Sequence, residues 1–183
     1  ILPGGVVTAK DTAEIELDAN GEFVRNPEVD LVKVAVVERH QGTGNVACGF
    51  LKGYGIKEGA VALSIAHDSH NIIVVGVSDE EMEFAVNSLI EQEGGMVLVK
   101  EGKVIESMPM PIAGLMSDQS GEWVDQKLTD IHEKAYEELG ICGDVEPVMT
   151  LCFMSLAVIP EIKLTDMGLF DVTTFSFIPV EAE

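Results

Sequence analysis

Short apolar segments, separated by glycine, asparagine and proline, dominate much of the chain. Segment 14–24 alternates apolar and polar residues about Asn20-Gly21, a pair that tolerates positive φ and therefore predicts a β-hairpin. A second hairpin is predicted over 96–107, with its turn at Glu101-Gly102. Further strands are predicted from apolar runs at 30–39, 60–66, 71–77 and 175–180.

Two other segments repeat their apolar residues at the helical period. In the first, Ser78 and Glu81 form a capping-box pattern, and Gly94-Gly95 ends the helix. The second helix lies within 121–140 and ends at Gly140. The expected apolar faces are Met82, Val86, Leu89 and Ile90 in the first helix, and Val124, Leu128, Ile131, Ala135 and Leu139 in the second.

Two stretches follow neither pattern. Segment 41–59 holds six glycines, and we expect a loop governed by its backbone, with a short helical turn near Phe50-Leu51 as one option. Segment 148–159 is the longest mostly apolar run and is bounded by Pro147 and Pro160. It predicts a buried helix or strand, because it is well short of the ~20 residues that a membrane span needs.

The order of these elements indicates the fold class. Strands that alternate with two to three helices predict a mixed α/β (α+β) protein, and the two hairpins favour a mixed β-sheet over a purely parallel one. Repeats, low-complexity tracts and linker-like segments are absent from the sequence. We therefore expect residues 1–183 to form a single compact domain.

Composition narrows the classes of partner. The formal net charge is −21, which repels phosphate backbones and anionic lipid, so we expect neither a nucleic-acid polymer nor a membrane as partner. Three widely spaced cysteines are typical of reduced thiols in a cytoplasmic protein, and the start "ILPGG" lacks the pattern of a signal peptide. A start without methionine also suggests a piece of a longer chain.

The segment "AHDSHN" holds the most concentrated candidate chemistry. His67, Asp68 and His70 are reasonable ligands for a divalent metal, and Ser69 and Asn71 complete the segment. On an extended strand the two histidines would point to opposite faces, so they converge only if the chain bends. Because Asp-Ser is turn chemistry, two interpretations stay open: a metal or catalytic site, or a polar turn at a strand end.

A second group of polar residues ends the strand predicted at 30–39. Glu38, Arg39 and His40 lead into the glycine-rich segment, and sequential strands often lie side by side, so His40 could join the "AHDSHN" histidines. For Arg39, an ion pair with Glu38 or Asp68 and a bound anion are the alternatives. The nearby "GTGN" lacks the pattern of a nucleotide phosphate loop.

A family resemblance adds to these observations. The stretches "VAVVERHQGTGN", "GFLKGYGIKEGAVALSIAHDSHNIIVVG", "GGMVLVKEGKV", "PMPIAGLMSD" and "MTLCFMSLAVIPEIKLTDMGLFDV" resemble the C-terminal region of microbial adenine deaminases of the amidohydrolase superfamily. The resemblance runs from Leu2 to about Val180 and is most specific from Glu38 to Gly76. Gln41 departs from it, because many relatives carry a second histidine there.

The resemblance implies a parent hydrolase that converts adenine and water to hypoxanthine and ammonia. In that family a (β/α)8 barrel, typically about 250 residues, holds divalent metal, Mn or Fe, and this chain is too short for it and has no H-x-H motif. The resemblance thus implies a domain that is inactive without the barrel, with adenine as the parent's substrate. Its expected tasks are packing against the barrel, closing over the substrate, or supplying a polar or metal-binding group.

The residues that we expect to lie near metal or substrate are His67, Asp68, His70 and His40, supported by Glu38, Arg39, Asn71 and Ser69. No residue of this chain is a certain catalytic residue, and no cofactor is certain in it. The alternative hypothesis is a stand-alone module that binds a metal or small ligand, or that serves assembly as a homo-oligomer.

Overall fold

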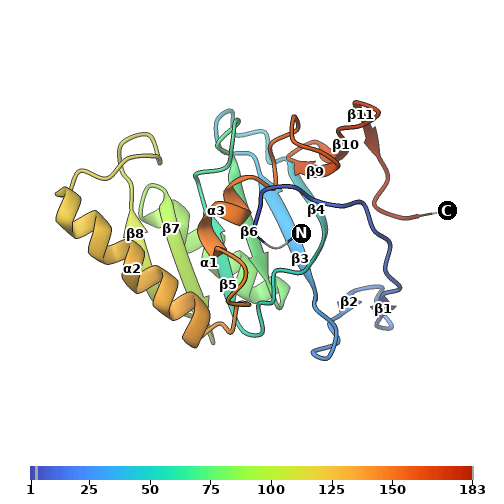
Figure 1. Cartoon of the computed structure of the whole chain (residues 1–183), viewed down its shortest axis with the longest axis horizontal. Coiled ribbons are helices and arrows are strands. Elements are labelled where there is room, and N and C mark those ends of the chain that lie inside the picture. Colours follow the sequence, from blue (N-terminus) through green and yellow to red (C-terminus); the bar gives the residue numbers. More distant parts are fainter. Residues whose placement is uncertain (3, 183) are drawn as a thin grey trace.

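A six-stranded sheet forms the centre of the protein (Figure 1). The computed structural model describes residues 1–2 and 4–182. The strands lie in the order β4-β3-β6-β5-β7-β8, and every neighbouring pair runs antiparallel. Their bounds are β3 Leu31–Val37, β4 Val46–Lys52, β5 Ala60–Leu63, β6 Ile72–Gly76, β7 Gly95–Lys100 and β8 Lys103–Pro109.

Helices cover both faces of this sheet. Helix α1 (Asp79–Glu91) packs on β5, β6 and β7 from one side, while α2 (Gly121–Glu137) and the short α3 (Pro147–Cys152) pack on the other side. Figure 1 shows α2 and α3 in front of the sheet and α1 behind it. The mixed α/β class with three helices is therefore confirmed, and the antiparallel pairing indicated by the hairpins extends through the whole central sheet.

Two small sheets complete the fold. Strands β1 (Glu16–Leu17) and β2 (Phe23–Val24) form the hairpin predicted at Asn20-Gly21, and Gly21 has the positive φ of 85°. The other small sheet contains β9, β10 and β11 and packs on β4 at the edge of the central sheet. Its strands span Ile162–Thr165, Gly168–Asp171 and Ser176–Ile178.

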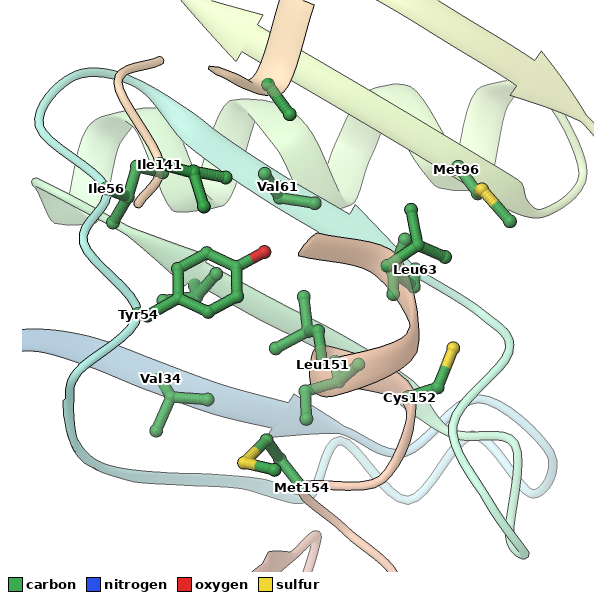
Figure 2. Packing of buried hydrophobic residues seen from close by; sticks show 14 of the residues in the cluster. Val34, Tyr54, Ile56, Val61, Leu63, Met96, Ile141, Leu151, Cys152 and Met154 are labelled. Carbon is green, nitrogen blue, oxygen red and sulfur yellow. The ribbon is translucent and has the colours of Figure 1, made fainter. Parts of the chain in front are cut away.

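The larger part of the core lies between the sheet and α2 and α3. Figure 2 shows Tyr54, Leu151 and Cys152 packed among the aliphatic side chains of the sheet strands. Tyr54 is fully buried, and its hydroxyl donates a 2.8 Å hydrogen bond to the carbonyl of Pro147. This bond satisfies a polar group inside the core, and it holds the start of α3 against the sheet.

The predicted helix signals are largely confirmed. The Ser78 side chain accepts from the Glu81 backbone N–H, but the Glu81 carboxylate accepts from Gly102 in the β7–β8 turn. The expected apolar face of α1 was wrong in one position, because Ile90 is 56% exposed and Ala85 is buried instead. In α2, Ile131 and Ala135 are buried as expected, and Leu139 beyond its end is buried too.

The glycine-rich segment 41–59 was predicted wrongly in its middle. Residues 46–52 form strand β4 instead of a loop with a helical turn, and this strand pairs with all seven residues of β3. Leu164 and Leu169 of the small sheet cover Gly49 at distances that leave room for a Cβ, so the strand does not depend on glycine there. Among the described residues, no helix has the length and apolar character of a membrane span.

Candidate functional site

The candidate residues gather at one end of the central sheet. Strand pairing brings the end of β3 beside the start of β6, and the end of β5 beside the start of β7. The end of β8 pairs with the start of β7 at the same end of the sheet. Loops 38–45, 64–71 and 110–118 lie at this end of the strands, and we call the region that they form the histidine end. It lies at the top of Figure 1.

The "AHDSHN" segment forms a tight turn. The His67 N–H donates to the Cys152 carbonyl at 2.9 Å, and the His70 N–H donates to the Ala66 carbonyl at 2.6 Å. This supplies the bend that the two histidines need, since their ring centroids are 5.4 Å apart. The His67 ring also lies against Phe153, at a centroid distance of 4.8 Å.

His40 joins this turn from the end of β3. Its Nε2 lies 2.7 Å from the carbonyl oxygen of Ser69. Because a carbonyl oxygen only accepts hydrogen bonds, Nε2 is the donor in this contact, and Nδ1 is the ring nitrogen that the contact leaves free. The structure therefore brings three of the four histidines to one end of the sheet, from two segments separated by about thirty positions in the sequence.

Glu38 organises its own loop. Its carboxylate accepts from the backbone N–H groups of His40, Gln41 and Thr43 and from the Thr43 hydroxyl. These hydrogen bonds, led by the one from the Thr43 backbone, lower the pKa of Glu38 to about 2. Glu38 is therefore an anchor of the loop that carries His40.

Arg39 forms neither of the expected ion pairs with Glu38 or Asp68. Its Nε donates to the His70 carbonyl at 2.5 Å, and its Nη2 donates to the Ala113 carbonyl at 2.9 Å. The ion-pair prediction was wrong because the Glu38 carboxylate accepts from its own loop, while the Asp68 side chain is 84% exposed to solvent. Arg39 thus bonds to carbonyl oxygens of two different loops.

Two more candidates support the turn. Asn71 is 4% exposed, and its Oδ1 accepts from the Arg39 backbone N–H at 3.3 Å. The Ser69 hydroxyl accepts from the Asn71 N–H at 3.4 Å. Both side chains therefore form hydrogen bonds that stabilise the turn.

His70 is electrostatically distinct at this end. Its Nδ1 is buried without a hydrogen-bond partner among the described residues. Burial is the main cause that lowers the pKa of His70, and the neighbouring His67 and Arg39 lower it further. The lowered pKa favours the neutral ring, and one of its nitrogens lacks its usual partner.

The donor set does not fit a resident metal ion. The described residues contain no group of three or more histidine, cysteine, aspartate or glutamate side chains that could hold one. Protein metal sites generally use three or four protein ligands, and the His67–His70 pair supplies two.

The methionines around "PIAGLMSD" predicted adaptable packing, or one wall of an apolar pocket or domain interface, but did not place loop 110–118 at this end. Met108 and Met110 are buried, whereas Met116 is 57% exposed beside the turn that carries Ala113 and Gly114. The sequence feature that marks this loop is the "PIAGLM" stretch, since a glycine in a loop indicates positive φ or close packing. That pattern does not identify Arg39 as its partner.

Comparisons with known proteins relate the whole chain to one family. A family model described as the adenine deaminase C-terminal domain matches residues 5–176. Adenine deaminase 2 of Desulfotalea psychrophila is 70% identical over 182 residues, which is 100% of this chain and 32% of that protein. The adenine deaminase of Ligilactobacillus salivarius is 49% identical over 183 residues, again 32% of its length. The adenine deaminase of Bacillus subtilis is 49% identical over 160 residues, which is 87% of this chain and 28% of the relative. The chain thus spans about a third of the length of these relatives.

Proposed function

This chain belongs to the family of adenine deaminase C-terminal domains, and we propose that it serves a hydrolase that converts adenine and water to hypoxanthine and ammonia. On this proposal residues 1–183 are one domain of that enzyme, and the amidohydrolase barrel is its partner. The full-length match to enzymes three times as long is the observation that carries the proposal.

The barrel part would hold the divalent metal, Mn²⁺ or Fe²⁺. The donor set of this chain does not fit a metal of its own, since the described residues contain no cluster of three ligand side chains. We therefore propose that purine deamination needs both parts. The three cysteines are unpaired, as suits a reducing compartment, and we extend the proposal to a cytoplasmic enzyme of purine metabolism.

The histidine end is our candidate for the surface that faces the substrate. It presents His67, His70 and His40 from short, well-anchored loops. A neutral His70 ring can donate or accept a hydrogen bond without placing charge beside an uncharged purine. A domain that covers the site would also exclude water and strengthen the polar interactions inside it.

Steady-state kinetics of the full-length enzyme tests this assignment. We expect His67→Ala and His70→Ala each to lower kcat/KM for adenine at least about tenfold, which corresponds to ~1.4 kcal/mol of transition-state stabilisation. His132→Gln is the matched control, because that histidine lies on α2 beside Glu146, away from the histidine end. Wild-type kcat/KM in both alanine variants would contradict the assignment.

The requirement for the barrel has its own test. We expect the 183-residue chain, incubated with adenine and Mn²⁺ or Fe²⁺, to release no ammonia above the protein-free control. Ammonia release that rises with the concentration of this chain would overturn the proposal that the domain needs the barrel.

A further inference from the structure

The guanidinium of Arg39 connects two loops that are far apart in the sequence. One donor binds the carbonyl of His70 in the "AHDSHN" turn, and another binds the carbonyl of Ala113 in loop 110–118. The guanidinium also packs against Gly114, where an added Cβ would lie 2.9 Å from Nη1. Arg39 therefore holds the second loop both by a hydrogen bond and by close packing.

The second loop is strained and closely packed at this point of contact. Ala113 has φ of 59° and Gly114 has φ of 73°, and a left-handed alanine is kept only where its surroundings over-determine it. The Ser64 hydroxyl donates to the Gly114 carbonyl at 2.5 Å from a buried position. The backbone of Gly94 packs directly against Gly114, since a Cβ added at Gly94 would lie 2.5 Å from the Gly114 Cα.

Loop 110–118 presents apolar side chains at the histidine end. Ile112 is 47% exposed and Met116 is 57% exposed, and backbone hydrogen bonds between these two residues close the loop. An apolar wall with a small number of fixed polar groups is the usual lining of a site for a small organic ligand. The proposed substrate is a flat, uncharged purine, whose faces can pack against apolar side chains of this kind.

We infer that Arg39 is a positioning residue that locks the His67–His70 turn and the Ile112–Met116 loop into one surface for the purine. This inference rests on the proposed function and names the residue that shapes its substrate-facing surface. Arg39 acts through geometry, because both of its side-chain bonds go to neutral carbonyls. Lysine cannot replace it, since one ammonium does not reproduce the planar set of donors that reaches both loops.

The test compares Arg39→Lys with Arg25→Lys in the full-length enzyme. Arg25 is the only other arginine in the sequence, and it too donates to a backbone carbonyl, that of Ile56, away from the histidine end. We expect Arg39→Lys to lower kcat for adenine at least about tenfold with KM within about threefold, because the substitution removes the hydrogen bonds that keep the two loops aligned. Arg25→Lys keeps the wild-type kcat.

Hydrogen–deuterium exchange supplies a readout that a general loss of stability would not give. In Arg39→Lys, peptides covering 66–71 and 110–118 should exchange at least about tenfold faster, while peptides from α1 and α2 keep their wild-type rates. Wild-type exchange in both loops, or wild-type kcat with faster exchange, would overturn the inference. If Arg39→Lys does not fold, Arg39→Gln, which retains one amide donor, takes its place with the same criteria.

The two proposals fail in different ways. If His67→Ala and His70→Ala leave kcat/KM unchanged, the proposed substrate-facing surface is wrong, whatever Arg39 does. If those variants are impaired while Arg39→Lys has wild-type kcat, the surface stands and only the positioning role of Arg39 is rejected.

Discussion

Ser64→Ala is the sharpest test of how the histidine end is held together. Ser64 lies just after β5 and is 1% exposed. Its hydroxyl donates to the Gly114 carbonyl at 2.5 Å and accepts from the Gly95 N–H at 2.7 Å. The substitution removes one oxygen atom, so it changes the packing little but leaves two buried backbone groups without partners.

The expected cost follows from those two groups. Leaving a buried donor or acceptor unsatisfied costs about 1–3 kcal/mol, so we expect the free energy of unfolding of Ser64→Ala to fall by about 3 kcal/mol. For a domain of this size, about 1 kcal/mol lowers Tm by about 2–4 °C, so Tm should fall by about 6–12 °C.

Urea denaturation of the 183-residue chain measures this cost, with the slope m expected to be unchanged. Ser176→Ala is the control, because its hydroxyl also forms a side-chain hydrogen bond, with Thr174, but at an exposed position. The control should lose less than about 0.5 kcal/mol. If the two variants lose the same free energy, the buried hydrogen bonds of Ser64 do not stabilise the loop as we argue.

Three further predictions concern single positions. Gly59→Ala should be strongly destabilised in thermal unfolding, because its Cβ would lie 1.9 Å from the Val99 carbonyl oxygen. Gly102 has the same φ of 67° but open space around it, so Gly102→Ala should lose only about 1–2 kcal/mol of unfolding free energy. Equal losses in the two variants would contradict the steric argument. The pKa of Glu38 is lowered to about 2 from 4.5, so the Tm of wild type relative to Glu38→Gln should decrease as pH falls from about 4.5 toward 2, and a pH-independent difference would count against it. Burial lowers the pKa of Lys163 to about 8 from 10.5, so the unfolded chain binds more protons than the folded chain between these pH values. The free energy of unfolding of wild type relative to Lys163→Met should therefore rise with pH across that range in urea titrations. A flat difference would mean that Lys163 titrates normally.

Local patterns were sufficient for most elements of the fold. The helical period and the Ser78 cap predicted α1, and Glu101-Gly102 predicted the β7–β8 turn, where both residues have positive φ. These features depend on interactions between residues that are close in the sequence, so they can be inferred without the tertiary structure. Strand β4 could not, because its glycine-rich sequence becomes a strand only through pairing with β3 and cover from the small sheet.

The candidate site shows the same division. The sequence alone placed His67 and His70 between two predicted strands and left a metal or catalytic site and a polar turn as alternatives. Its resemblance pointed to an adenine deaminase domain, which the family match bears out. The tertiary structure decided that His40 bonds to that turn and that Arg39 ties it to Ala113, across 74 positions of the sequence. The physical reason is that the order of the strands places the ends of β3, β5 and β8 at the same end of the sheet. No periodic pattern within a single segment encodes which loops meet there.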